Sequence, residues 1–202
     1  MPRPYCNLCQ RPQVSCICHL IQPTENDIHV VILQHPSEEK QSKGTVKLLS
    51  QSLASCQVFI AEDFTQHHDL LTVMKKYKHN IALLYPSEKA EVVTKQCDSN
   101  LDNEIRCIIL LDGTWKKAYR IYMMNKILQD IPHRVLPDDV TGQYIIRKTQ
   151  KQGALSTLEA CCYGLSIMES SPKKYKGLLE KFVIFNQMQL AFVPKNKLKP
   201  KE

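Results

Sequence analysis

The first eighteen residues contain four cysteines, Cys6, Cys9, Cys16 and Cys18, in the pattern C-x2-C-x6-C-x-C. Zinc binds four thiolates in a tetrahedron, and two close pairs of cysteines bring four sulfur atoms together with little ordering of the chain. The spacing therefore predicts a structural zinc site, with His19 as a substitute ligand. The alternative is four free thiols in a frayed N-terminus, which this density of cysteines disfavours.

A second candidate site, residues 111–115 (LDGTW), lies at the end of the most apolar run of the chain. In open α/β sheets, ligands bind beyond the carboxyl ends of the strands. Asp112 is then placed to accept a proton or hold a ligand, and Gly113 allows close approach of the backbone. The only tryptophan, Trp115, is either a core anchor at the start of a helix or a ligand contact.

Two more polar groups stand where ligands are expected. His35 and Glu38 follow the first expected strand, where a histidine is either a structural residue or a participant in the chemistry. Ser156 and Glu159 fit a capping box, in which each side chain bonds the backbone amide of the other residue. The capped helix start also presents amides to an anion, and Arg147 nearby offers a fork for a carboxylate or phosphate.

These residues need elements that position them, and the apolar pattern past residue 25 alternates between short apolar runs and stretches of helical period. Strands are expected at residues 28–34, 57–61, 80–85 and 106–111, and helices at 45–54, 70–77, 90–97, 115–128, 156–168 and 175–190. Ser87 is expected to cap the helix at 90–97. Repeated strand-then-helix order indicates an α/β fold with an open, mostly parallel sheet flanked by helices. Residues 132–155 interrupt that order, which is typical of a functional loop.

Composition narrows the class of protein. The 202 residues are 43% apolar and 23% charged, which is ordinary globular usage and argues against disorder or a coiled coil. No apolar run approaches ~20 residues and no signal peptide begins the chain, so we expect a soluble, cytoplasmic protein without a membrane partner. There is no glycine-rich phosphate loop, G-x-S-x-G or H-E-x-x-H motif.

Charge and the remaining cysteines add two expectations. Of the net charge of +7, the tail at 195–202 contributes +3 and the body +4, a balance that permits a polyanionic partner without requiring one. An odd cysteine count disfavours a disulfide framework. We expect buried core thiols at the five other positions, Cys56, Cys97, Cys107, Cys161 and Cys162.

Taken in order along the chain, these pieces resemble the DTW-domain family of tRNA-uridine aminocarboxypropyltransferases. The matching segments are the four-cysteine cluster, 35–38 (HPSE), 84–86 (LYP), 112–115 (DGTW), 147–148 (RK) and 155–160 (LSTLEA). Lys43-Gly44-Thr45 departs from the pattern, because relatives usually carry Asn before the Thr. The resemblance implies a SPOUT-like fold, with a C-terminal trefoil knot within 132–155. It also implies S-adenosylmethionine as cofactor and transfer of its 3-amino-3-carboxypropyl group to N3 of a tRNA uridine, releasing 5'-methylthioadenosine.

The resemblance also implies roles for individual residues. Asp112 is the candidate base that removes the N3 proton, with its pKa raised by a partly apolar loop. Cofactor contacts are implied for Leu84, Tyr85, Pro86, Leu111, Gly113, Thr114, Arg147, Ser156, Thr157 and Glu159. Substrate contacts are implied for His35, Glu38, Trp115 and Lys148. For His35 and Glu38 a purely structural role stays open, and Trp115 either stacks on a base or anchors its helix.

The expected organisation is a four-cysteine zinc-binding module at 1–25, a SAM-binding catalytic domain at 26–194 and a basic tail at 195–202. Phosphate contacts are expected from the zinc module and the tail. Two alternatives remain: a SPOUT-type RNA methyltransferase, and a zinc-containing RNA-binding module without catalysis. The sequence leaves open which uridine is modified and whether the protein dimerises.

Overall fold

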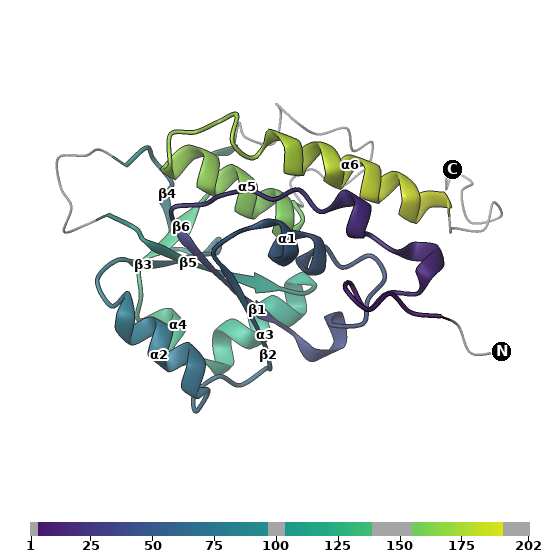
Figure 1. Cartoon of the computed structure of the whole chain (residues 1–202). Helices are drawn as coiled ribbons and strands as arrows, with labels where there is room; N and C mark the ends of the chain where they lie inside the picture. Colours follow the sequence, from purple (N-terminus) through teal and green to yellow (C-terminus); the bar gives the residue numbers. More distant parts are fainter. Residues whose placement is uncertain (1–3, 97–103, 139–154, 192–202) are drawn as a thin grey trace, which may run out of the picture.

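Six parallel strands form the centre of the molecule. The computed structural model describes residues 4–96, 104–138 and 155–191, and in this part of the chain the strands form one open sheet of order β2-β1-β5-β3-β6-β4 (Figure 1). The strands are β1 (His29–Gln34), β2 (Cys56–Ile60), β3 (Ile81–Leu84), β4 (Glu91–Val92), β5 (Cys107–Asp112) and β6 (His133–Val135). Every pair is parallel, so the expected mostly parallel sheet is entirely parallel among the described residues.

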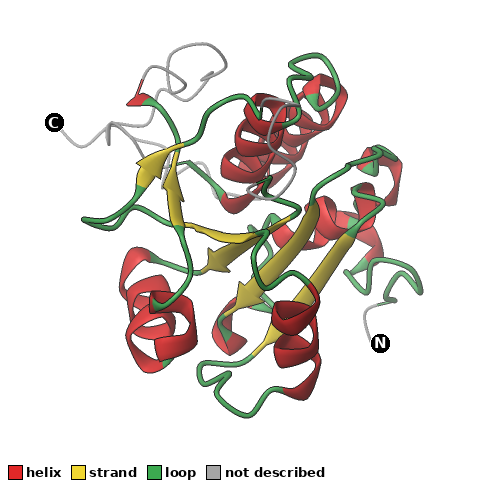
Figure 2. Ribbon diagram, turned by 90° about the vertical axis from the view of Figure 1, so that its left-hand side faces the viewer, coloured by secondary structure: helices red, strands yellow, loops and turns green. Residues whose placement is uncertain are grey.

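Helices cover both faces of the sheet (Figure 2). One face carries α1 (Val46–Ser52), α5 (Thr157–Met168) and α6 (Lys176–Ala191), and the other carries α2 (His68–Lys76), α3 (Trp115–Met124) and α4 (Lys126–Gln129). Short 3-10 turns are η1 (Gln13–Ser15), η2 (Cys18–Leu20) and η3 (Pro36–Glu38). Alternate residues of β1 serve the two faces: Val30 and Ile32 pack toward α5, Val31 and Leu33 toward α3. This explains the unbroken apolar run in the sequence.

The chain leaves the neighbouring strands β1 and β5 in opposite directions at their carboxyl ends. β1 and β5 pair in register up to Gln34 and Asp112. The chain leaves β1 toward α1 on one face, and it leaves β5 toward α3 on the other face. In open α/β sheets, ligands bind at such a switch in direction, beyond the carboxyl ends of the strands. We call this position, around Gln34 and Asp112, the crevice. The fold therefore places residues 34–38 and 112–115 at the expected binding position.

The expected helix at 90–97 is wrong. Residues Glu91–Val92 form the edge strand β4 beside β6, and the amide of Val93 donates to the carbonyl of Val135 at 2.8 Å. Ser87 does not cap a helix, because its hydroxyl bonds Nδ1 of His133 at 2.5 Å. Burial of Val93 against the core overrides the local helical pattern here.

The single helix expected at 115–128 is also wrong, because the chain breaks between α3 and α4 at Asn125. Its side chain is fully buried: Nδ2 donates to the carbonyls of Ile121 and Glu62, and Oδ1 accepts from the amide of Phe64. These bonds satisfy the backbone groups left open by the break. They also tie the end of α3 to the loop that carries Glu62.

Several sequence expectations concern residues beyond the described ones. Residues 139–154, most of the segment expected to form the knot, lie outside the described part of the chain, as do Arg147, Lys148, Cys97 and the basic tail. Among the other expected core thiols, Cys107, Cys161 and Cys162 are buried and Cys56 is half-buried, and all four are free. Within the described ranges, no helix is long and apolar enough to cross a membrane.

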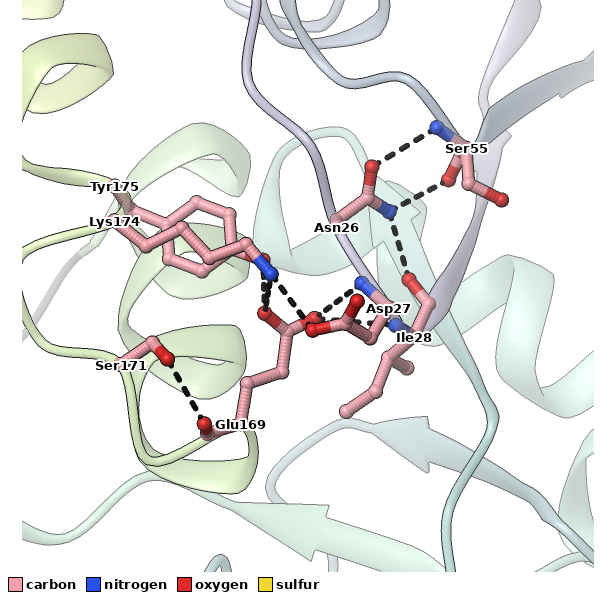
Figure 3. Close-up of polar contacts among 8 residues, drawn as sticks. All are labelled: Asn26, Asp27, Ile28, Ser55, Glu169, Ser171, Lys174 and Tyr175. Carbon is pink, nitrogen blue, oxygen red and sulfur yellow. Dashed lines mark hydrogen bonds and ion pairs between the residues drawn. The ribbon is translucent and has the colours of Figure 1, made fainter.

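A buried carboxylate fixes the α5–α6 connection to the start of β1 (Figure 3). Glu169 accepts from the amides of Asp27 and Ile28 at 2.9 and 3.1 Å through Oε1. Its Oε2 accepts from Lys174 Nζ at 2.8 Å and from the Tyr175 hydroxyl at 2.6 Å. Burial, together with this hydrogen bond, raises the pKa of Tyr175, so the phenol remains protonated and donates. Four donors on one carboxylate join segments far apart in sequence.

Glu169→Gln is expected to lower the free energy of unfolding by about 1–3 kcal/mol. The new amide nitrogen cannot accept from Lys174 or Tyr175, while the remaining oxygen still accepts from the two backbone amides. Urea unfolding measures the effect. Ser171→Ala is the control, because the Ser171 hydroxyl donates to the Glu169 carbonyl and not to its carboxylate, and we expect a change within about 0.5 kcal/mol. Equal midpoints for the two variants would contradict the role given to the carboxylate.

Candidate functional site

Asp112, the last residue of β5, stands at the centre of the crevice. Its Oδ1 accepts from the Thr157 hydroxyl at 2.6 Å, and its Oδ2 accepts from Gln34 Nε2 at 2.8 Å. The residue is 8% exposed, and burial raises the pKa of the carboxyl even though both hydrogen bonds oppose the shift. Each carboxylate oxygen can accept more than one hydrogen bond, so Asp112 keeps capacity for a proton from a ligand.

The start of α5 points at this carboxylate. Ser156 and Glu159 form the expected capping box: the Glu159 amide donates to Ser156 Oγ at 3.2 Å, and the Ser156 amide donates to Glu159 Oε2 at 2.9 Å. Thr157, the next residue, reaches Asp112. The cap fixes the first turn of α5, whose positive end favours a negative group in the crevice.

His35 joins the loop after β1 to two other loops. Its backbone amide donates to the carbonyl of Asp112 at 3.0 Å, and its Nδ1 accepts from the amide of Ser37 at 3.2 Å. With Nδ1 accepting, Nε2 carries the proton and donates to Glu62 Oε1 at 2.6 Å. Glu62 Oε2 in turn pairs with Arg120 of α3 at 2.9 Å. The histidine is therefore held on both ring nitrogens beside the candidate base.

The loop between β5 and α3 packs tightly against the His35 loop. A Cβ at Gly113 would lie only 2.9 Å from Cβ of Lys117, so the turn into α3 needs glycine, whereas its distance of 3.6 Å from Cβ of His35 is an ordinary contact. Lys117 Nζ pairs with Glu38 Oε1 at 2.6 Å. Glu38 thus holds α3 in place beside the crevice.

The residues expected around a cofactor fall on both sides of the sheet. Leu84 ends β3 and packs on the α5 face, whereas Tyr85 is buried on the α3 face with its ring stacked on Tyr122 at 5.0 Å. Pro86 and Thr114 are exposed, and Leu111 is half-buried. Trp115 is 60% exposed on α3, so the core-anchor interpretation is wrong and an outward contact remains.

The four N-terminal cysteines converge on one point. Their sulfur atoms all lie within 4.8 Å of one another, with Cys6 and Cys18 at 3.5 Å and Cys9 and Cys16 at 3.8 Å. A tetrahedron of Zn–S bonds near 2.3 Å separates its sulfur atoms by about 3.8 Å, so the cluster is of the right size. Backbone N–H groups of Cys9 and Leu8 lower the pKa of Cys6 to about 6, whereas burial and the neighbouring thiols raise the pKa of Cys18 to about 12. The donor set fits a closed, structural zinc site.

Arg11 connects this cluster to the rest of the fold. Its guanidinium lies 5.1 Å above the ring of Phe185 in α6 and donates to the carbonyls of Ser42 at 2.7 Å and Gly44 at 3.3 Å. Both of these hydrogen bonds come from Nη2, and Nη1 is buried without a hydrogen-bond partner among the described residues. A positive group beside Cys9 would offset the negative charge that four thiolates would carry with a bound Zn²⁺.

A comparison with known protein families matches residues 3–190 to the DTW domain. The chain belongs to the DTW-domain family. It is 33% identical to tRNA-uridine aminocarboxypropyltransferase 2 of Macaca fascicularis, over 93% of this chain and 64% of the relative. The protein of the same name from Mus musculus is 35% identical over 84% and 58%, and that from Drosophila melanogaster 33% over 86% and 70%. The chain therefore spans less than two thirds of the length of the two mammalian relatives. No solved structure gives a significant match.

In this DTW domain, the structure shows contacts with Asp112 and His35 that the sequence did not predict. Gln34 and Thr157 bind the Asp112 carboxylate, and Glu62 binds His35. Thr157 was selected only as a cofactor contact. The available signal for Gln34 and Glu62 was their position, since each is a polar residue at or just after the end of an apolar strand. Arg147 and Lys148 lie outside the described residues.

Proposed function

We propose that the chain transfers the 3-amino-3-carboxypropyl group of S-adenosylmethionine to N3 of a uridine in tRNA, releasing 5'-methylthioadenosine. The observation that carries the proposal is the buried Asp112 carboxylate, of raised pKa, at the carboxyl ends of the neighbouring strands β1 and β5. The names of the relatives from mammals and fly support the reaction class and the substrate. The all-parallel sheet is consistent with the further proposal of a SPOUT-like catalytic domain with a C-terminal trefoil knot.

When bound, S-adenosylmethionine supplies an electrophilic carbon attached to a positively charged sulfur, which is a good leaving group. In the proposed reaction Asp112 accepts the N3 proton of uridine as N3 forms its bond to that carbon. The carbon–sulfur bond breaks with its electron pair passing to sulfur, which becomes the neutral thioether of methylthioadenosine. Asp112 leaves the step as a carboxylic acid, and a buried carboxyl of raised pKa tolerates that form.

The crevice also offers a place for the carboxylate of the group being transferred. The first turn of α5, fixed by Ser156 and Glu159, presents backbone amides and a positive helix end next to Asp112. We assign Arg147 to the same carboxylate and Lys148 to the RNA. Holding the donor carbon in line with N3 is the main task of these groups, because positioning supplies much of the rate in a displacement with a good leaving group.

The test uses the purified chain, S-adenosylmethionine and unmodified tRNA transcripts, followed by mass spectrometry of the nucleosides. We expect a uridine heavier by one aminocarboxypropyl group and an equal amount of methylthioadenosine. S-adenosylhomocysteine with a methylated nucleoside would instead identify a methyltransferase. RNA binding without any product would identify a non-catalytic RNA-binding domain, and either result would overturn the proposal.

A further inference from the structure

The outward face of α3 carries a stripe of large apolar side chains. Trp115, Tyr119 and Met123 are 60%, 56% and 52% exposed. They are spaced four residues apart, so they follow one face of the helix over about 12 Å. The stripe begins at Trp115, three residues after Asp112, and leads away from the crevice. Large exposed apolar side chains in a row are unusual on a surface that binds nothing.

The segment that carries this stripe has basic residues and no acidic residue of its own. Residues 114–129 contain four basic residues and no acidic residue. Lys117 and Arg120 pair with Glu38 and Glu62 of neighbouring loops, whereas Lys116 and Lys126 make no ion pair within the described ranges. Aromatic rings interleaved with cations are the surface that single-stranded nucleic acids use, with bases stacking on the rings and phosphates meeting the cations.

We propose that the stripe of Trp115, Tyr119 and Met123 is a stacking platform for unpaired nucleotides adjacent to the target uridine. The substrate class is then RNA that is single-stranded around the reactive base, such as a loop. A length of about 12 Å accommodates roughly three stacked nucleotides at ~3.4 Å each. This inference rests on the proposed function, which supplies the RNA, but it concerns a surface outside the crevice.

A second copy of the chain fits the stripe less well. A two-fold interface brings the same patch of each copy together, so Lys116, unpaired among the described residues, would approach its own counterpart. Residues 114–129 offer no acidic side chain to meet Lys116, so the two lysines would repel across the contact. A polyanion has the complementary charge.

The sole tryptophan makes the platform directly measurable, because a base stacked on Trp115 quenches its fluorescence. The chain is titrated with single-stranded hexauridylate and, separately, with an RNA duplex of the same length. We expect saturable quenching by the single strand and tighter binding of it than of the duplex. Tyr119→Ala is expected to weaken binding of the single strand by about tenfold to a hundredfold, and Tyr119→Phe by no more than about twofold.

Leu190→Ala is the matched control, because Leu190 is an exposed apolar residue on α6, across the sheet. It should leave the affinity unchanged. Unchanged binding by Tyr119→Ala, or a preference for the duplex, would overturn the proposal. A wild-type dimer that Tyr119→Ala converts to a monomer in light scattering would also overturn it, in favour of an interface between copies.

Failure of this inference can be told apart from failure of the proposed function. The binding assay needs neither S-adenosylmethionine nor turnover. Fluorescence quenching by RNA without any transferred group would therefore contradict the proposed function and leave the stacking platform supported. If Tyr119→Ala transfers the group to tRNA with the wild-type rate and affinity, the stacking platform is contradicted and the proposed function is not.

Discussion

Asp112→Asn is expected to lower the rate of transfer by a factor of about 10²–10⁴ while the protein remains folded. Asparagine matches the shape of aspartate and its oxygen still accepts from Thr157, but the amide cannot take the N3 proton. Gln34 can turn its own amide and offer an oxygen to the new NH2 group, so the hydrogen bonds of the buried site survive. Asp112→Ala would leave the donors of Gln34 and Thr157 without an acceptor. A loss of activity could then come from misfolding as well as from the missing base.

The control for this variant is Asp130→Asn, which removes an exposed carboxylate at the end of α4 and should transfer at the wild-type rate. Affinity for tRNA, measured without S-adenosylmethionine, should stay within about twofold for both variants. Transfer by Asp112→Asn at the wild-type rate would remove Asp112 from the role of base.

The raised pKa of Asp112 adds a dependence on pH. Only the carboxylate accepts a proton, so the rate should rise with pH through a pKa higher than that of an ordinary aspartate. The same shift means that the folded protein holds this proton more tightly than the unfolded chain. Its contribution to stability is therefore present at low pH and is lost as pH rises through the folded-state pKa. In a series of urea titrations, Asp112→Asn should lack this contribution.

Removal of the metal is expected to have the largest effect on stability. We expect one zinc ion per chain in the purified protein, and chelation should lower the free energy of unfolding by at least about 4 kcal/mol, the linkage expected at free metal near 1,000 times the Kd. The cost falls on the whole domain, because Cys9, Ile17 and Leu20 are part of the same core as α5 and α6. Thermal unfolding with and without chelator measures it.

Cysteine variants separate metal binding from general damage. Cys9→Ser should abolish the bound zinc and lower the unfolding temperature as chelation does. Cys56→Ser changes a half-buried thiol outside the cluster and should keep one zinc per chain, whatever its effect on stability. Full zinc occupancy in Cys9→Ser, or unfolding that chelation leaves unaltered, would contradict the site.

The sequence predicts most elements of this fold because its apolar runs are long and buried on both faces. It also places Asp112 at a strand end, since a carboxylate after the most apolar strand has few other interpretations. The errors occur where a single long-range contact decides the local structure. Pairing with β6 makes residues 91–92 a strand, and the buried amide of Asn125 divides a helix.

The hydrogen bonds among the side chains of the site could not be predicted from the sequence for a related reason. Gln34, Glu62 and Thr157 meet their partners only after the strands take the order β2-β1-β5-β3, and no periodicity encodes that order. The exposure of Trp115 could not be predicted either, because an aromatic residue in the first turn of a helix faces the core or the solvent according to the elements that pack against that helix.

The contact of Arg11 with Phe185 ties the beginning of the domain to its last helix. The half-buried guanidinium of Arg11 is stabilised by a cation–π contact with that ring and by hydrogen bonds to the carbonyls of Ser42 and Gly44. Natural variants of this chain should therefore covary at these distant positions. A homologue without an aromatic residue at position 185 should also have another residue in place of Arg11.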